Sequence, residues 1–413
     1  MPIGDCRIVE RLAWTDQRLA ELALPGGAMV LTRSLTSGLT QRAADPSDVF
    51  WGVGDRGPNI KPGDAARRYG LAALAPLAGI DGAKIMPLPD AGPAIARFRL
   101  AGKTVELDAV ISLRAPDGTL LCGLAPPALP GMETESVFAL DGTAFGPAWD
   151  GVDTEGIAAL ADGRFWISEE YGPSLLLTGP DGIVVQRLVP EGAGQMFAGS
   201  SIPTEERLPA IGLARKLNRG IEALALSPGG DTLYAAFQSP LAHPDRDAHE
   251  NGDVIRIWAL DPATVAFRAE FIYPLDGPQT FVRDRAAGPV AKSDVKVSEL
   301  ACLPDGSLLV LERVTLSTHI YRVRPGGGAA APACFHDPRH RPTVEQIGQA
   351  GAKAAGMPLL DKELVVSTDS DGEICGDLEG MLVLDDGSML LVNDSDYGIE
   401  GAVSQFWRIS APW

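Results

Sequence analysis

Four glutamates occupy the same place in four similar segments of the chain. Each is followed by an apolar stretch, a turn containing glycine, a second apolar stretch and a polar or acidic end, as in "DTEGIAALADGRFWISEEYG" at 153–172. The four are Glu155, Glu222, Glu299 and Glu379, separated by 67, 77 and 80 residues. A single glutamate at a strand start is usually just solvated. Four at one repeat position indicate a shared task, for which carboxylate oxygens that bind a cation are the natural chemistry.

A second set of polar residues stands at the far end of each hairpin. In an antiparallel hairpin, residues equally far from the turn face one another. Counting from the glycine turns pairs each leading glutamate with a partner, to within one residue. The predicted pairs are Glu155 with Glu170, Glu222 with Gln238, Glu299 with Glu312, and Glu379 with Asp394. Each hairpin should therefore bring both of its polar ends to one rim.

The elements that position these residues are short strands repeated at long intervals. Periods of this length, each filled by several strands, are typical of propeller blades with insertions. A weaker copy of the hairpin lies at 38–59, and further strands are expected within 181–190, 253–262, 319–327 and 405–413. Helices are expected only between repeats, at about 204–217 and 343–355. The sequence predicts an all-β protein with a β-propeller fold.

The number of blades follows less directly from the repeat. Five hairpins can be recognised, and the segment 109–124, "AVISLRAPDGTLLCGL", could hold a sixth. We expect six blades, with five or seven as alternatives, in a single domain over 1–413. Pairing of the last strand with the N-terminal segment would close the ring and remove an open sheet edge.

The leading glutamates should converge, because the first strand of each propeller blade runs along the central channel. Carboxylates about 6 Å apart repel by roughly 3 kcal/mol per pair at an effective dielectric near 20. A cluster of four must take up protons or bind a cation. Oxygen ligands and only five histidines in the chain favour Ca²⁺, with Mg²⁺ or Mn²⁺ as alternatives, over Zn²⁺. Glu155, Glu222, Glu299 and Glu379 are thus predicted metal ligands.

The remaining polar residues of the rim are assigned to catalysis and to substrate binding. Predicted catalytic residues are Glu169, Glu170, Glu312 and Asp394. Predicted substrate-binding residues are Asp55, Arg56, Tyr171, Arg219 and Arg313, since a guanidinium can hold a phosphate or carboxylate with two parallel hydrogen bonds. An equally weighted alternative is that the arginines pair with the glutamates in a structural network.

Composition excludes several classes of function. The net charge of −19 argues against nucleic acid as a partner. No apolar run reaches the length of a membrane span, and neither a GxSxG motif nor a Ser–His–Asp set is recognisable. The N-terminus carries no evident signal peptide, which predicts a cytoplasmic protein, or a periplasmic or secreted one if the N-terminus was trimmed. The oligomeric state is left open.

The segments "DTEGIAALADGRFWISEEYGPSLLL", "NRGIEALALSPGGDTLYAAFQSPL" and "VSELACLPDGSLLVLER" resemble the phytase-like family described as having esterase-like activity. The resemblance runs from about residue 28 to the end. It implies a propeller with acidic residues at its active site, acting on phosphoric or carboxylic esters. The acidic positions that match are Glu155, Glu169, Glu170, Glu222, Glu299, Glu312 and Glu379.

Three functions are compatible with these residues. The first is a metal-dependent hydrolase that acts on small anionic or ester substrates at the channel mouth. The second is a lactonase-like enzyme whose ion polarises a ring carbonyl. The third is a non-catalytic propeller that binds a partner and keeps a structural ion. Hydrolysis tests with and without a chelator distinguish the first two from the third.

Overall fold

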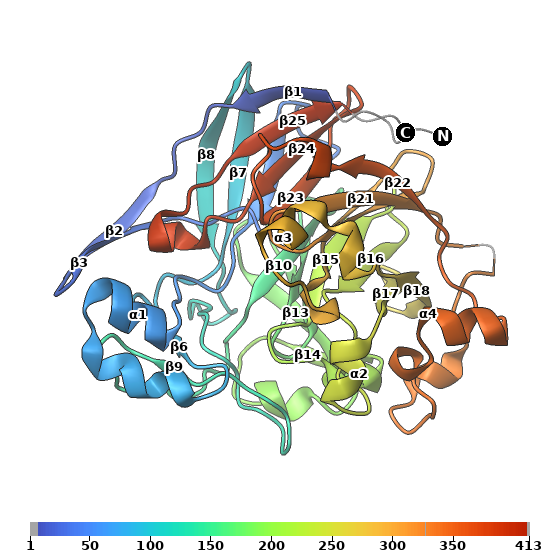
Figure 1. Cartoon of the computed structure of the whole chain (residues 1–413), viewed down its shortest axis with the longest axis horizontal. Helices are drawn as coiled ribbons and strands as arrows, with labels where there is room; N and C mark the ends of the chain where they lie inside the picture. Colours follow the sequence, from blue (N-terminus) through green and yellow to red (C-terminus); the bar gives the residue numbers. More distant parts are fainter. Residues whose placement is uncertain (1–6, 327, 411–413) are drawn as a thin grey trace.

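The computed structural model describes residues 7–326 and 328–410. Most of the regular structure is β, and five largely antiparallel sheets carry it (Figure 1). No helix among the described residues is long and apolar enough to cross a membrane.

Each of the five sheets contains four or five strands. The first sheet contains β4 (Gly38–Thr40), β5 (Val49–Val53), β7 (Ala94–Ala101) and β8 (Thr104–Ser112). The second contains β10 (Thr154–Ala159), β11 (Phe165–Glu169), β12 (Ser174–Thr178), β13 (Val184–Pro190) and β14 (Thr204–Leu208). The third contains β15 (Ile221–Leu226), β16 (Leu233–Phe237), β17 (Val254–Leu260) and β18 (Phe267–Pro274). The fourth contains β19 (Lys296–Cys302), β20 (Leu308–Arg313), β21 (Thr318–Val323) and β22 (Lys362–Ser367). The fifth contains β23 (Leu378–Val383), β24 (Ser388–Asn393), β25 (Phe406–Ser410) and β1 (Arg7–Leu12).

Two-stranded ribbons and short helices complete the described structure. The ribbons are β2 (Arg18–Leu24) with β3 (Gly27–Thr32), and β6 (Lys84–Ile85) with β9 (Val137–Phe138). The α-helices are α1 (Pro62–Tyr69), α2 (Arg246–Asn251), α3 (Val282–Ala287) and α4 (Val344–Ala355). The 3₁₀ helices are η1 (Ala72–Gly79), η2 (Gly194–Phe197), η3 (Ala210–Ala214), η4 (Pro278–Thr280), η5 (Lys292–Asp294), η6 (Ala333–His336), η7 (Thr368–Ser370) and η8 (Asp396–Gly401).

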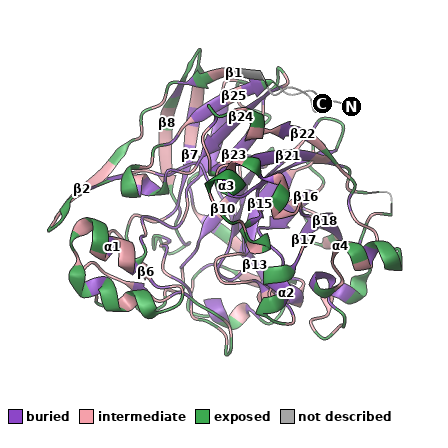
Figure 2. Ribbon diagram, in the orientation of Figure 1, coloured by how far each residue is buried: buried purple, intermediate pink, exposed green. Residues whose placement is uncertain are grey.

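The first strands of the five sheets contact one another in a closed cycle. Strand β4 contacts β10, β10 contacts β15, β15 contacts β19, β19 contacts β23, and β23 returns to β4. One apolar core lies between each pair of neighbouring sheets, so that both faces of every sheet are covered. Figure 2 shows the result, with buried central strands and mostly exposed helices. This arrangement is propeller-like, as the repeat predicts.

The chain ends close the cycle as expected. Strand β1 pairs antiparallel with β25, with Leu12 opposite Phe406, so the two ends of the described chain share one sheet (Figure 1). The strands expected within 181–190, 253–262 and 319–327 are present as β13, β17 and β21. The strand expected at 405–413 is present as β25 up to Ser410, and 411–413 lie outside the described residues.

Two expectations about the elements need correction. The segment 109–124 forms no sheet of its own, because its apolar start extends β8 in the first sheet and the rest is a loop with isolated bridges. The helix expected at 204–217 is instead β14 followed by η3, since residues 204–208 pair in parallel with β13. The helix expected at 343–355 is present as α4.

Candidate active site

Five carboxylates from three sheets converge where the first strands begin. Asp55 follows β5, Asp153 and Glu155 stand at the start of β10, Glu170 follows β11, and Glu222 stands in β15. Oxygens of Asp55, Asp153 and Glu155 lie within 4.8 Å of one another, and so do oxygens of Glu155, Glu170 and Glu222. Glu155 belongs to both groups. We call these five residues the carboxylate cluster.

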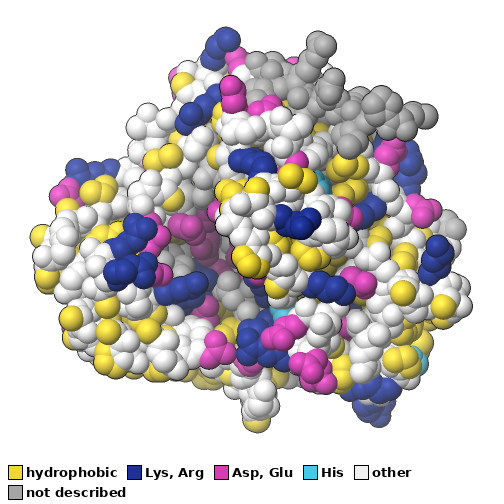
Figure 3. All heavy atoms as spheres, viewed as in Figure 1, with side chains coloured by type: hydrophobic (Ala, Val, Ile, Leu, Met, Phe, Trp, Pro, Cys, Tyr) yellow, Lys and Arg dark blue, Asp and Glu magenta, His cyan; other side chains and the backbone are white. Residues whose placement is uncertain are grey.

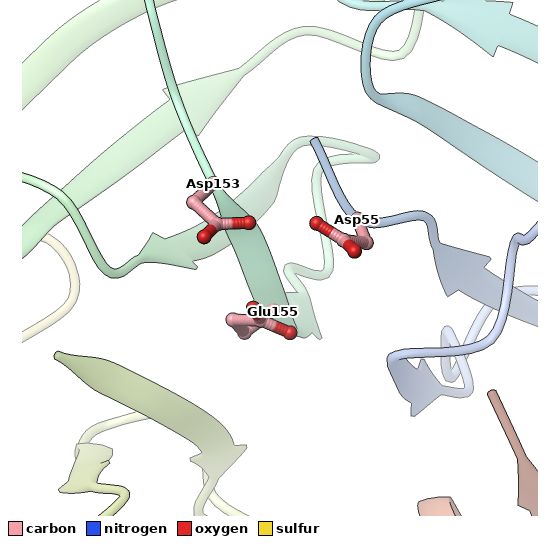
Figure 4. Close-up of side chains that lie close together, drawn as sticks. All are labelled: Asp55, Asp153 and Glu155. Atoms are coloured by element: carbon pink, nitrogen blue, oxygen red, sulfur yellow. The ribbon is translucent and has the colours of Figure 1, made fainter. Parts of the chain in front are cut away.

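The close-up view shows how the first of these groups is built. The carboxylates of Asp55 and Asp153 point toward each other from different sheets, and Glu155 lies beside them on β10 (Figure 4). On the face drawn in Figure 3 the molecule is hollowed, and Asp and Glu side chains gather inside the hollow. Carboxylates that face one another at such short range are suited to hold a cation.

A β-bulge at the start of each repeated first strand decides which side chain reaches this position. The register shifts there in all four hairpins, leaving one or two residues without a paired partner. The bulged residues are Glu155, Glu222, Ser298 and Glu379. A bulge bends the strand and redirects a side chain, and here it points three of the four leading glutamates to the same rim.

Glu299 is the exception, and its predicted equivalence to the other three is wrong by one residue. It pairs with Leu311 rather than with Glu312, because Ser298 occupies the bulge. The Glu299 side chain is fully buried and accepts hydrogen bonds from the backbone N–H of Leu39 at 3.0 Å and of Leu300 at 2.9 Å. The bond from Leu39 ties β19 to β4 across the ring, which is a structural role.

Burial and mutual repulsion make it costly for the cluster to be fully ionised. Burial, opposed by the Arg56 guanidinium, raises the pKa of Asp153 to about 7. Burial and then Glu222 raise the pKa of Glu170 to about 8, and burial and then Glu379 raise that of Glu222 to about 7. The pKa values of Asp55 and Glu155 also lie well above the ordinary range, chiefly through burial.

Several oxygens of the cluster are buried with nothing to bond to. Among the described residues, Asp153 Oδ1, Glu170 Oε2 and Glu222 Oε2 have no hydrogen-bond partner. Their side chains are 3% exposed or less, so bulk water does not replace the missing partner. A buried polar atom without a partner costs about 1–3 kcal/mol. The residues therefore fit a bound cation, because Asp153 belongs to one of the two converging groups of carboxylates, and Glu170 and Glu222 belong to the other.

Two of the three predicted substrate-binding arginines are already committed to carboxylates. Arg56 contacts Glu135 at 2.8 Å and Asp153 at 3.0 Å and is 5% exposed. Arg313 is 1% exposed and bonds Asp377 at 2.7 Å, Ser298 Oγ at 2.8 Å and the Glu379 carboxylate. These two arginines therefore pair with carboxylates in a network, as the alternative interpretation of the sequence predicts. Arg219, half-buried, keeps one side-chain contact among the described residues, to Gln238 Oε1.

Tyr171, predicted to bind substrate, instead holds this network together. Its hydroxyl donates to the backbone carbonyl of Gly123 at 2.8 Å and accepts from Arg56 Nη1 at 3.1 Å. The side chain is buried at 2% exposure, and its hydroxyl is already hydrogen-bonded.

Of the four residues predicted as catalytic, two lie beside other acidic residues of the rim and two lie elsewhere. Glu170 belongs to the cluster, and Asp394 lies beside Glu379 and contacts Ser34 Oγ. Glu169 points away, because successive residues of a strand face opposite sides, and it accepts bonds from Tyr171 N, Gly172 N and Ser174 Oγ. Glu312 lies in a separate buried group, accepting from Tyr273 Oη at 2.7 Å and Lys362 Nζ at 2.9 Å.

Two residues of the site escaped the sequence reasoning. Asp153 stands two positions before Glu155, and the same D-x-E spacing recurs at Asp377 and Glu379. This repeated spacing is the signal that could have identified Asp153. Lys296 stands at the equivalent place in β19, where the spacing reads K-x-S. Its pKa is lowered to about 8, first by burial and then by the neighbouring Arg313 and Arg219.

The different positions of Asp55 and Glu299 give a direct test. Asp55→Asn is expected to weaken Ca²⁺ binding at least about tenfold, because it removes a charged ligand. Glu299→Gln is expected to leave the Ca²⁺ dissociation constant within about twofold of wild type and to lower the melting temperature, because one buried acceptor is lost. Calorimetric titration and thermal melts of both variants measure this. Equal loss of affinity in the two variants would return Glu299 to the ligand set.

Comparisons with known proteins identify the family of this chain. Residues 34–397 match the family model described as phytase-like, esterase-like activity of phytase. The chain belongs to the phytase-like family. It is also 30% identical over 240 residues to an "uncharacterized secreted protein" of Arthroderma benhamiae, covering 51% of this chain and 45% of that protein. The match thus spans less than half of that relative's length.

Solved structures give weaker similarities. The PQQ-bound aldose sugar dehydrogenase of Streptomyces coelicolor is 12% identical, with a TM-score of 0.36 over 99% of this chain and 98% of that one. The hydrazine synthase of Kuenenia stuttgartiensis is 10% identical, with a TM-score of 0.32 over 76% of each chain. Scores this low carry no argument about function.

Proposed function

We propose that this phytase-like protein is a divalent-cation-dependent hydrolase of phosphoric or carboxylic esters. The observation that carries the proposal is the set of buried cluster oxygens without partners, Asp153 Oδ1, Glu170 Oε2 and Glu222 Oε2. Such oxygens are where a protein holds a hard cation, and five carboxylates suit the high coordination number of Ca²⁺. Membership of a family described by esterase-like activity supports the reaction class.

Four residues of the cluster have a proposed role. Asp55, Asp153 and Glu155 hold the cation. When bound, the cation lowers the pKa of a water molecule and offsets negative charge on the reacting ester. Glu170 accepts the proton of the attacking water at Oε2, since the backbone N–H of Gly220 fixes Oε1 at 2.9 Å. The water oxygen bonds to phosphorus or to the acyl carbon, the bond to the alcohol oxygen breaks, and the alcohol leaves with a proton.

Two features of the surroundings extend the proposal. We infer five blades, because the first strands of five sheets form the cycle of contacts and an apolar core fills each of the five interfaces. We also infer export from the cytoplasm, on the name of the fungal relative, which describes a secreted protein. The proposed partner is a small ester substrate, with no nucleic acid.

The proposal is tested by hydrolysis with and without the cation. Purified protein is treated with EDTA, dialysed, and assayed on p-nitrophenyl phosphate, p-nitrophenyl acetate and a γ-lactone, with and without added Ca²⁺, Mg²⁺ or Mn²⁺. We expect hydrolysis of a p-nitrophenyl ester to disappear with EDTA and to return with Ca²⁺. Turnover of the lactone alone would establish the lactonase-like alternative. Cation binding without turnover of any of the three substrates would indicate a binding protein with a structural ion.

A further inference from the structure

One sheet reverses the charge pattern of the rim. In the second sheet the positions before, at and opposite the bulge are the acidic Asp153, Glu155 and Glu170. The fifth sheet repeats this pattern with Asp377, Glu379 and Asp394. In the fourth sheet the equivalent positions are Lys296, Ser298 and Arg313. This equivalence follows from the strand register. Lys296 is paired with Arg313 in the fourth sheet. Asp153 and Glu170 lie opposite each other in the same way in the second sheet, where Glu170 N donates to the Asp153 carbonyl at 3.0 Å.

The order of the sheets places this reversed pattern across the ring from the proposed cation. Strand β19 contacts β15 and β23, whereas Asp55, Asp153 and Glu155 come from the sheets of β4 and β10. Those two sheets are the ones that β19 does not neighbour in the cycle. The three proposed cation ligands and the basic side chains of β19 and β20 therefore come from sheets that are not neighbours in the cycle.

Among these basic side chains, Lys296 is the one without a direct ion pair, although the Glu222 and Glu379 carboxylates lie near enough to favour its charged form. All three guanidinium nitrogens of Arg313 are occupied, by Ser298 Oγ, by the Val314 carbonyl and Asp377, and by Glu379. Among the residues that the structure describes, the Lys296 ammonium has no hydrogen-bond or ion-pair partner, although the side chain is half-buried. Arg219 lies next to it, since Val297 N donates to the carbonyl of Gln238, the residue whose side chain Arg219 contacts.

We propose that Lys296, supported by Arg219, binds the anionic oxygens of the substrate, and that the substrate is therefore a phosphate ester rather than a neutral carboxylic ester. This inference rests on the proposed function, since it places the phosphate between the cation and Lys296. A phosphate held there would contact positive charge on both sides, which a neutral ester does not require. A lysine acts here as a point charge that can follow the oxygens of the phosphate.

The test compares Lys296→Met with Lys296→Arg and with Lys103→Met as the matched control. Met keeps the length of the side chain and removes the charge, Arg keeps the charge, and Lys103 is an 82% exposed lysine on a distant hairpin. Two quantities are measured for each protein: the dissociation constant of inorganic phosphate by calorimetry at saturating Mg²⁺, and KM for p-nitrophenyl phosphate and p-nitrophenyl acetate. Thermal melts and Mg²⁺ titration establish that the fold and the cation site persist.

We expect Lys296→Met to weaken phosphate binding at least about tenfold, because a hydrogen bond to a charged group is lost. KM for p-nitrophenyl phosphate should rise by a similar factor while KM for p-nitrophenyl acetate changes less than about twofold. Lys296→Arg should recover most of the phosphate affinity, and Lys103→Met should match wild type. Phosphate affinity within about twofold of wild type in Lys296→Met, or an equal rise of KM for both esters, would overturn the inference.

The phosphate titration keeps this inference distinct from the proposed function. If no ester is hydrolysed but Lys296→Met still weakens phosphate binding, the hydrolase proposal fails and the anion site stands. If hydrolysis depends on the cation but Lys296→Met leaves phosphate binding intact, the anion site fails and the hydrolase stands.

Discussion

Glu155→Gln is expected to lower ester hydrolysis at least about a hundredfold while the protein remains folded. Among the described residues, Glu155 is the one that both groups of converging carboxylates share, so its charge acts on the other four carboxylates of the cluster. A hundredfold loss corresponds to roughly 2.7 kcal/mol of barrier, the size typical of losing one well-placed electrostatic contact. The measurement is kcat and KM for p-nitrophenyl phosphate at saturating cation, together with Ca²⁺ affinity by calorimetry.

The stability of the cation-free variant separates a catalytic role from a structural one. The pKa of Glu155 is raised by burial and then by Glu222 and Asp153, so replacing its carboxylate relieves repulsion. Without cation, Glu155→Gln should therefore melt at the same temperature as wild type or higher, and it should lose the stabilisation that Ca²⁺ gives the wild type by linkage. The exposed Glu191→Gln serves as the matched control. Unchanged turnover in a folded Glu155→Gln variant would remove Glu155 from the site.

Cation affinity is expected to rise about tenfold or more between pH 6 and pH 8. The pKa values of Asp153 and Glu222 are about 7 and that of Glu170 is about 8, chiefly through burial, so at pH 6 all three hold protons that a cation must displace. Binding should therefore release protons. Calorimetry in two buffers of different ionisation enthalpy measures both the affinity and the number of protons released. An affinity that does not change over this range would contradict the placement of the cation beside these carboxyls.

The same groups set the pH dependence of stability without the cation. Their folded pKa values lie above the ordinary values of 3.8 for Asp and 4.5 for Glu, so the folded state binds more protons than the unfolded chain from about pH 4 to pH 8. The free energy of unfolding should therefore fall as the pH rises through this window. We expect the melting temperature in EDTA to be several degrees lower at pH 8 than at pH 6. Adding Ca²⁺ should raise the melting temperature more at pH 8 than at pH 6.

The repeat that specifies the sheets and the rim is local, and the sequence alone therefore determined it. Alternating apolar stretches around glycine turns identified β10 with β11, β15 with β16, β19 with β20 and β23 with β24, because strand pairing across a tight turn depends on neighbours in the chain. The convergence of Glu155, Glu170 and Glu222 followed from the same repeat. The closing pair of β1 and β25 followed from the need to remove an open sheet edge. The carboxylates of these hairpins define the chemistry of the mouth.

Only the tertiary structure decided which member of each hairpin faces that mouth. All four hairpins have a bulge at this place, but in β19 the bulged residue is Ser298. Glu299 therefore turns into the ring, where it accepts a hydrogen bond from Leu39 N. Contacts between residues far apart in the chain decided the rest. Arg56 is taken by Glu135, 79 residues away, and Glu312 by Lys362, 50 residues away. Asp55 reaches Asp153 only because β4 and β10 are neighbours in the cycle. A bulge and a long-range ion pair depend on packing between sheets, which the pattern of one hairpin does not encode.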